Sequence, residues 1–275
     1  MANAKALLVV SAAVYALVVR PRMLRWSASD EEVRRPYPGA SLIPGGRRGA
    51  TMAVTIDAPP SSVWPWLVQM GCDRAGWYSW DRLDNGGVPS AERIHPEWQR
   101  LSVGDRLAST PGGRAWFEVA ALEPERFLGL RASIDLRSGR PFDPAGPRPR
   151  FYVDALWGFH LTELTDGRTR LVVSGYASAR PRLLQAIADL LFWEPAHWIM
   201  QRRQFTNLTR RAERPPPPLR DERQEGMGLP GERATEVILP ERGHLAASDA
   251  IGARERQVLR GVPRAEAVSE ELRGD

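Results

Sequence analysis

Residues 51–80 constrain the fold more than any other part of this 275-residue chain. Apolar side chains alternate with smaller ones over residues 52–56, which predicts a strand with one buried face. The Asp-Ala-Pro-Pro-Ser-Ser run at residues 57–62 has the turn and cap chemistry that ends a strand and starts a helix. Apolar residues then recur at spacings of three and four, which predicts a helical stripe made of Val63, Trp66, Leu67 and Met70. An aromatic element, residues 76–80, follows, and this succession suits a sheet wrapped around a pocket.

Three motifs in this region carry a resemblance to a known superfamily: TIDAPP at residues 55–60, VWPWLVQMG at residues 63–71 and GWYSWD at residues 76–81. Further matches are RIHPEWQ at residues 93–99, VGD at residues 103–105 and EPAH at residues 194–197. On these motifs the chain resembles the START/Bet v1-like superfamily, also called SRPBCC or polyketide cyclase/dehydrase-like proteins. The resemblance implies an α+β helix-grip fold, in which a curved antiparallel sheet wraps around a long C-terminal helix and encloses a ligand cavity. It implies no single activity, because the superfamily contains binders, transporters and enzymes.

Composition divides the chain into three parts. Residues 214–275 begin with an arginine and four prolines, are rich in glycine, proline and charge, and hold few aromatic residues. Such a segment buries too little apolar surface to offset the entropy lost on ordering, so we expect it to be largely disordered, with a short helix near residues 252–259. One globular domain remains, residues 26–213, after a hydrophobic N-terminal segment, residues 1–25.

The N-terminal segment predicts a hydrophobic helix. Residues 6–19 are apolar except for Ser11 and the phenol of Tyr15. A helix over this run spans about 21 Å, short of the roughly 30 Å hydrocarbon core, but a helix over residues 2–24 would reach across if its flanking basic side chains extended to the headgroups. Three interpretations stay open: a membrane anchor, a helix docked on the domain, and a secretory signal peptide, although no Ala-x-Ala cleavage pattern follows.

Charge around this segment predicts which side of a membrane the domain would occupy. Arg20, Arg22 and Arg25 follow the apolar run and outweigh Lys5 and the terminal amine before it. By the positive-inside rule, an anchored chain would keep its domain in the cytoplasm. We therefore expect the protein to be at the cell membrane, with its domain in the cytoplasm. Without a membrane anchor, we expect the whole protein in the cytoplasm. The single cysteine, Cys72, allows no intramolecular disulfide and fits a reducing compartment.

The remaining composition excludes several classes of protein. The net charge is +5, but the arginines are scattered singly and form no stripe that would track a phosphate backbone. The sequence contains no Gly-rich phosphate loop, no dinucleotide fingerprint, no Gly-x-Ser-x-Gly elbow and no His-Glu-x-x-His motif. We expect no cofactor and no nucleic-acid partner.

Five further strands are predicted, and their alternation indicates which side chains face inward. They cover residues 105–109, 115–122, 126–134, 151–164 and 169–179, with Asp166-Gly167 as the turn between the last two. On strands 115–122, 151–164 and 169–179 the odd-numbered positions are almost all apolar and include Phe117, Trp157 and Phe159. On strand 126–134 the matching positions are even-numbered: Leu128, Leu130 and Ala132. The same alternation places polar residues on the outer face, namely Glu118, Arg131, His160 and Tyr176. An apolar inward face disfavours an acid or base catalyst carried by the sheet.

A long closing helix is predicted over residues 182–213. Its apolar stripe should press onto the sheet and consists of Leu184, Ile187, Leu191, Trp198 and Phe205. Pro195 should kink this helix. Four arginines should form its solvated side: Arg202, Arg203, Arg210 and Arg211.

The predicted ligand-binding residues come from the aromatic element, the inward strand face and the closing helix. They are Trp77, Tyr78, Trp80, Asp81, Phe117, Trp157, Phe159 and Trp198. Tyr78 and Asp81 are three residues apart, so on one helix face they would hydrogen-bond a carbonyl or hydroxyl group of a ligand; packing and helix capping is the competing interpretation. His95 and Glu97 are candidate rim groups on the loop at residues 84–101.

A metal site is not predicted. Glu194 and His197 have the Glu-x-x-His spacing of carboxylate metal sites, but one copy supplies too few ligands. A hydrogen-bonded pair at a helix kink explains the two residues better.

Three functions fit this sequence. The first is a domain that binds a hydrophobic small molecule, a lipid or a polyketide-like ring system, in an apolar cavity at the cytoplasmic membrane face. The alternative is a polyketide cyclase- or dehydratase-like enzyme that uses Tyr78 and Asp81 at the pocket. A third is a membrane-tethered interaction module whose tail recruits partners. The apolar inward face favours the first.

Overall fold

The Asp166-Gly167 turn joins the two longest strands, β7 (Tyr152–Glu163) and β8 (Thr169–Arg180), in the computed structural model, which describes residues 2–214. Gly167 has φ +79°, the left-handed backbone that such a turn requires. The two strands pair along their whole length, from Tyr152 opposite Arg180 to Glu163 opposite Thr169. The expected tail and its short helix near residues 252–259 lie outside the described residues.

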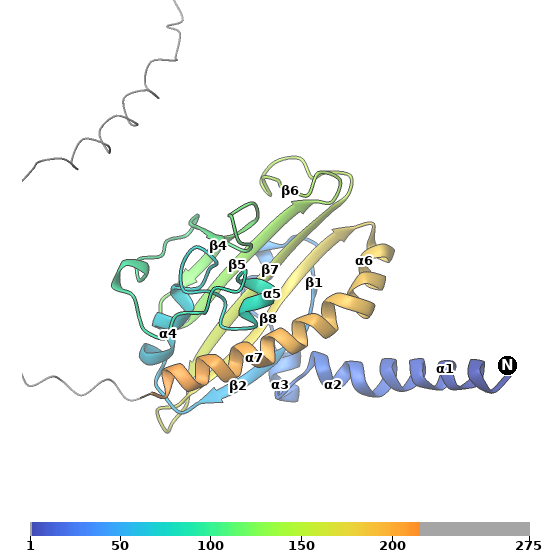
Figure 1. Ribbon diagram of the computed structural model, residues 1–275, viewed down its shortest axis with the longest axis horizontal. Helices are drawn as coiled ribbons and strands as arrows, with labels where there is room; N and C mark the ends of the chain where they lie inside the picture. The colour runs from blue at the N-terminus through green and yellow to red at the C-terminus, as the bar shows by residue number, and fades with distance from the viewer. Residues whose placement is uncertain (1, 215–275) are drawn as a thin grey trace, which may run out of the picture. The chain divides into compact units, whose positions relative to one another are not determined.

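The described strands form one open antiparallel sheet in the order β1-β8-β7-β5-β4-β3, as Figure 1 shows. β2 (Met52–Ile56) also pairs with β8, and β6 (Arg140–Pro141) pairs with β5. The other members are β1 (Arg47–Arg48), β3 (Arg106–Ala108), β4 (Trp116–Glu123) and β5 (Phe127–Asp135). The predicted strands are confirmed, with ends that differ by one or two residues. The fold is the expected α+β arrangement, with an antiparallel sheet and a long C-terminal helix.

The helices are short except for the first and the last. The α-helices are α1 (Ala2–Val14), α2 (Arg20–Leu24), α3 (Asp30–Arg34), α4 (Pro60–Val68), α5 (Asp81–Asp84), α6 (Arg182–Ala188) and α7 (Glu194–Ala212). Two π-helical turns, η1 (Tyr15–Val19) and η4 (Asp189–Trp193), connect α1 to α2 and α6 to α7. Two 3₁₀ turns complete the set, η2 (Ala40–Leu42) and η3 (Pro96–Trp98).

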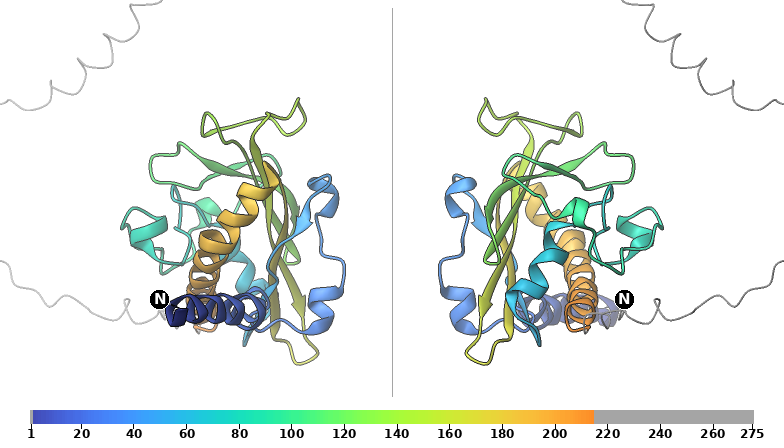
Figure 2. Two further views of the ribbon diagram at one scale, coloured as in Figure 1. Left: turned by 90° about the vertical axis from the view of Figure 1, so that its right-hand side faces the viewer. Right: turned by 90° about the vertical axis from the view of Figure 1, so that its left-hand side faces the viewer.

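The main core lies between one face of the sheet, here called the inner face, and helices α4 and α7 (Figure 2). Leu128, Phe159 and Val173 are opposite one another on neighbouring strands and are at most 1% exposed. From α7, Phe205 and Leu208 pack into the same cluster. Burial of each such side chain contributes roughly 1.5–3 kcal/mol, so this cluster fixes the helix on the sheet.

The outer face of the sheet is covered by the chain between α2 and β2. Tyr37 donates hydrogen bonds from its phenol to the backbone oxygens of Gly158 and Val172, at 2.7 and 3.0 Å. Its ring packs edge-on against Phe127, with centroids 6.0 Å apart. The predicted outward direction of His160 is confirmed, because its ring also faces Tyr37.

Only the second half of the closing helix packs as predicted. Phe205 is 4% exposed and Trp198 is partly buried, whereas Leu184, Ile187 and Leu191 are 64%, 45% and 71% exposed. The prediction was wrong for these three residues because α6 runs beyond the covered part of the inner face. Among the four arginines expected on the solvated side, Arg211 is instead buried and donates to the backbone oxygens of residues 90 and 91.

The N-terminal helical segment contacts the closing helix at three points. The Tyr15 phenol donates to the backbone oxygen of Leu190 at 2.9 Å, and Arg20 pairs with Glu194. Trp26 meets Trp198 edge-on, with ring centroids 5.8 Å apart. Within residues 2–214, no helix combines the length and the hydropathy needed to cross a membrane.

Candidate functional site

Four of the eight predicted ligand-binding residues form one aromatic cluster on the inner face. Trp157 is at its centre, with ring centroids 5.7 Å from Trp77, 5.7 Å from Phe117 and 4.7 Å from Phe159. Trp77 also meets Phe117 edge-on at 5.4 Å. We call these four residues the inner aromatic cluster. Alternation within the strands correctly predicts that Phe117, Trp157 and Phe159 share one face.

The turn before Trp77 holds this ring in place. Gly76 has φ +78° and bridges to Gly71, and a side chain at Gly76 would bring its Cβ to 2.5 Å from the Ser90 hydroxyl oxygen. Gln204 of α7 donates its amide Nε2–H to the Trp77 backbone oxygen at 2.9 Å. The Trp77 indole N–H points to the Cys72 sulfur at 3.3 Å. The ring is therefore fixed both by its own turn and by the closing helix.

Buried polar groups without a hydrogen-bond partner among the described residues occur in this cluster and on helix α7. They include the indole Nε1 atoms of Trp157 and Trp198 and the side-chain Oε1 of Gln201. Gln201 is 2% exposed and uses its Nε2–H on Gln204 at 2.8 Å, which leaves its oxygen as a free acceptor. Buried polar atoms are normally satisfied, so a donor and an acceptor left open in an apolar region are candidate ligand anchors.

His197 of α7 also meets the inner aromatic cluster, edge-on to Trp157 at 6.4 Å. Burial lowers the pKa of its imidazole to about 4, although part of the residue reaches solvent. The ring is therefore neutral at pH 7 and supplies one donor and one acceptor. Sequence reasoning assigned His197 to a pair with Glu194 and missed its contact with Trp157, because that contact joins residues distant in sequence.

Beyond Trp157, toward α6, the inner face is uncovered. Cross-strand pairing places seven residues on this part of the face, and all are partly or largely exposed: Ala132, Ile134, Val153, Ala155, Gly175, Ala177 and Ala179. We call this surface the open apolar face. On the other side of Trp157, toward the Asp166-Gly167 turn, the inward positions carry large side chains that are buried, as at Phe159 and Leu171. The site thus consists of small apolar residues that end at a wall of aromatic rings.

Tyr78 and Asp81 do not share a helix face. Tyr78 precedes α5, has φ +58° and is fully buried, with its phenol oxygen accepting from Gln69 Nε2 at 2.7 Å. Burial raises its pKa well above the usual range for tyrosine. Asp81 begins α5 and accepts from the Ser90 hydroxyl at 2.6 Å, and the same hydroxyl accepts from the Tyr78 backbone N–H at 3.1 Å. Ser90 therefore ties the two residues together as part of the framework.

The other predicted residues lie outside the aromatic cluster. Trp80 is 44% exposed and stacks under Arg203, whose guanidinium carbon is 5.1 Å from the ring centroid. Trp198 packs on Trp26, as described above. On the loop, His95 Nδ1 is 3.2 Å from Glu97 Oε1, and the His95 ring packs on Trp98 with centroids 4.3 Å apart.

Glu194 turns away from His197 to Arg20, so the two residues do not form the expected pair. Residues 2–214 contain no group of three His, Cys, Asp or Glu side chains placed to hold an ion.

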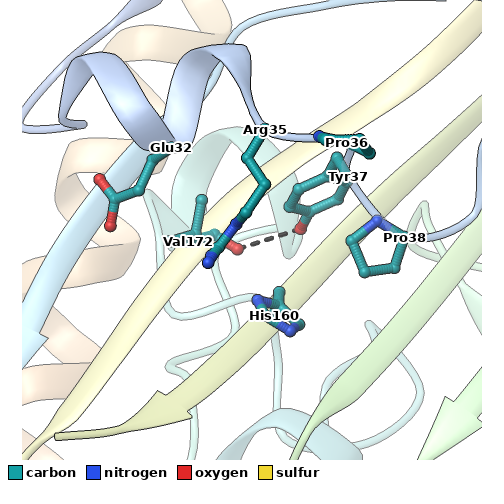
Figure 3. A pocket seen from close by; sticks show the side chains of 7 residues that line it. All are labelled: Glu32, Arg35, Pro36, Tyr37, Pro38, His160 and Val172. Atoms are coloured by element: carbon teal, nitrogen blue, oxygen red, sulfur yellow. Dashed lines mark hydrogen bonds between the residues drawn. The ribbon is translucent and has the colours of Figure 1, made fainter.

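A cavity of about 210 Å³ lies on the outer face, and sequence reasoning missed it (Figure 3). Its walls are Glu32, Arg35, Pro36, Tyr37, Pro38, His160 and Val172. Two of its polar groups are already engaged, because Tyr37 bonds the sheet backbone and Glu32 pairs with Arg170 at 2.8 Å. The outward alternation of His160 was its signal in the sequence.

Comparison with known proteins supplies no function. No family model matches the chain, and no curated protein matches it. Similar solved structures include the Mesorhizobium loti protein MLL2253, with 20% identity, 60% of this chain and 95% of that chain covered, and a TM-score of 0.33. DynU16, a protein from the dynemicin biosynthetic locus, has 18% identity, 57% and 46% coverage and a TM-score of 0.34. The Polyketide_cyc-like protein Cgl2372 from Corynebacterium glutamicum has 17% identity, 62% and 89% coverage and a TM-score of 0.26.

Of these three, Cgl2372 is the one described as polyketide cyclase-like. At such identities and TM-scores, the likeness carries no argument about family or activity. The class of protein is therefore defined by the sheet and closing helix described above, a helix-grip domain with an uncovered apolar inner face.

Proposed function

We propose that this domain binds a hydrophobic small molecule, a lipid or a polyketide-like ring system, on the open apolar face. The observation that carries the proposal is a change along the inner face. From Trp157 toward the Asp166-Gly167 turn the face is a buried core, whereas from Trp157 toward α6 it consists of uncovered, mostly small apolar residues. Alanine and glycine at five of the seven positions leave space that larger residues would fill. An apolar ligand would cover this surface and remove it from water.

The inner aromatic cluster and its neighbours indicate the chemistry of the ligand. The rings of Trp77, Phe117 and Trp157 offer faces and edges to a flat or extended apolar body. The Trp157 Nε1 donor and the Gln201 Oε1 acceptor are buried and lack a partner among the described residues, so each would bind a polar group, such as a carbonyl or a hydroxyl, of a ligand that displaces the side chains covering them. We therefore propose a ligand with a large apolar body and few polar atoms.

Binding is favoured over cyclase or dehydratase catalysis. The enzyme hypothesis required Tyr78 and Asp81 to reach a substrate together. The Tyr78 phenol is fully buried and hydrogen-bonded to Gln69, and Asp81 is bonded to Ser90. His197 is neutral and faces an aromatic ring. These residues supply no pair of an acid and a base around the open apolar face.

We also propose that the domain works at the cytoplasmic face of the cell membrane. The apolar residues of α1 and η1 and the arginines that follow support this location. A ligand of low water solubility would reach the domain from the bilayer.

Native mass spectrometry of protein purified from its own host, followed by organic extraction, tests the proposed function. The expected result is a reproducible apolar molecule that leaves the protein on extraction. Protein that carries nothing, and that takes up no lipid or aromatic probe when these are added, would contradict it.

A further inference from the structure

Large apolar side chains are exposed on two helical segments that lie far apart in the sequence. On α6 and η4 they are Leu183, Leu184, Ile187, Leu191, Phe192 and Trp193, between 45% and 72% exposed. On α1 and η1 they include Leu7 and Leu17, at 67% and 77% exposed. Contiguous exposed apolar surface of this kind marks a site for a protein partner or a membrane, because it is costly to leave in water.

The two segments are joined to each other. The Tyr15 phenol of η1 donates to the Leu190 backbone oxygen of η4 at 2.9 Å, and Arg20 pairs with Glu194 one residue beyond η4. In Figure 1, α1 and α6 lie on the same side of the view, with α6 beside the end of β8 and α1 extending away from the sheet below it. We call the exposed apolar residues of α1, η1, α6 and η4 the paired-helix surface.

The charges around the paired-helix surface are mostly positive. Residues 2–24 contain no acidic residue, and Arg22 follows η1. Arg180 and Arg182 are exposed at the start of α6. Of the two acidic residues on η4 and directly after it, Glu194 is offset by its pair with Arg20, whereas Asp189 accepts from the neutral amide of Gln185 at 2.6 Å.

We propose that α6 and η4, together with α1 and η1, lie in the headgroup–acyl boundary of a bilayer that contains anionic lipids. Arginines around an apolar centre that includes Phe192 and Trp193 fit this boundary, where aromatic side chains concentrate and anionic headgroups attract cations. A second copy would bring the same positive charges together, which disfavours a symmetric dimer through this surface. The inference deepens the membrane location proposed above by assigning a second contact, on the closing helix.

This geometry would also give the ligand a route. α6 begins two residues after β8 ends, so it borders the open apolar face at Ala177 and Ala179. A bilayer in contact with α6 would therefore lie beside the uncovered face.

Flotation of the full chain with vesicles tests the second contact. Wild-type protein is expected to float with phosphatidylcholine vesicles that contain phosphatidylglycerol. Phe192→Asp is expected to lower the partition coefficient about tenfold or more, because burial of one large apolar side chain in the bilayer raises the partition coefficient by at least this factor. The matched control is Val103→Asp, at a residue 63% exposed on a loop, which should partition like the wild type.

A further variant separates this inference from the membrane location itself. If Leu17→Asp lowers partition and Phe192→Asp does not, the N-terminal segment binds lipid alone and the second contact is wrong. If no variant and no wild-type protein floats, the membrane location fails as well, while ligand binding on the open apolar face is untouched.

A fluorescent label at Leu191→Cys, in a Cys72→Ser background, shows what covers the surface. Without vesicles, the label should emit like one exposed to water, and its emission should shift to the blue when vesicles are added. The same label at Val103→Cys should show no shift when vesicles are added. Emission already shifted to the blue without vesicles would mean that a second copy or another part of the chain covers the surface, and would overturn the inference.

Discussion

Arg20 and Glu194 form a two-pronged ion pair, with Nε and Nη2 of the arginine 2.6 and 2.7 Å from the two carboxylate oxygens. The pair joins the start of the described chain to the closing helix, 174 residues later. The arginine is 36% exposed and the glutamate 18%, so water screens the pair only in part. Both carboxylate oxygens of Glu194 are therefore engaged by Arg20.

This pair should couple measurably in a double-mutant cycle. Arg20→Leu and Glu194→Gln are each expected to destabilise the fold, with a coupling energy of about 1–2 kcal/mol, because two-pronged charged hydrogen bonds are stronger than ordinary surface pairs. Urea unfolding of the two single variants and the double variant measures it. The pair Arg34 and Asp30, 3.9 Å apart and exposed, is the control and should couple by about 0.5 kcal/mol or less. Equal coupling energies in both pairs would contradict the role of Arg20 in holding the N-terminal segment on the closing helix.

Asp154 should contribute far more to stability than an exposed aspartate. Its carboxylate is fully buried and accepts from Arg131 at 2.8 Å and from Arg148 at 3.2 Å. Asp154→Ala leaves these arginines without their partner and is expected to cost about 3–5 kcal/mol in the free energy of unfolding. Asp57→Ala, which removes an exposed ion pair at 3.6 Å, should cost about 1 kcal/mol or less. Similar losses in the two variants would contradict the buried cluster.

Stability should fall in mild acid because of His197. Burial lowers its pKa to about 4, whereas the unfolded chain has the ordinary value of about 6.5. Between these values the unfolded state binds more protons than the folded state, so stability is complete above about pH 6.5 and is lost as the pH falls toward 4. The loss should approach but not exceed about 1.4 kcal/mol per pH unit. His197→Phe should flatten this part of the profile, and an unchanged profile in that variant would show that other groups cause it.

Gly175 should be irreplaceable on the open apolar face. A Cβ atom built there lies 1.8 Å from the Leu156 backbone oxygen, too close for any side chain without movement of β7 or β8. Gly175→Ala is therefore expected to lower the free energy of unfolding by about 3 kcal/mol or more. Gly49→Ala, where a Cβ meets nothing within 4 Å, should change it by about 1 kcal/mol or less. Thermal unfolding of both proteins compares them, and a tolerated alanine at Gly175 would show that the strands can separate.

The strands and the composition of the inner face were predictable from the sequence because alternation is a local property. A residue such as Trp157 shows its face through its neighbours two positions away. The turn at residues 166–167 was likewise local. The register then follows from the hairpins, which is why Phe117, Trp157 and Phe159 could be placed together.

The exposed residues of α6 could not be predicted in the same way. A helical stripe such as Leu184, Ile187 and Leu191 shows that one side of the helix is apolar, but not whether the sheet extends far enough to cover it. The positive φ of Tyr78 and the docking of Tyr15 on η4 depend on contacts distant in sequence. Because of those contacts, Tyr78 is part of the buried framework. The open apolar face lies farther along the sheet, between Trp157 and α6.

Titration with an apolar fluorescent probe, such as N-phenyl-1-naphthylamine, tests ligand binding on the open apolar face most directly. Ala177 is the most exposed residue of this face, so Ala177→Trp should occupy the surface without a large cost in stability. Ala40→Trp, at an exposed residue on the other side of the sheet, is the matched control. The account predicts that the wild type and Ala40→Trp bind the probe alike and that Ala177→Trp binds it at least about tenfold more weakly. Equal binding by all three proteins would contradict it.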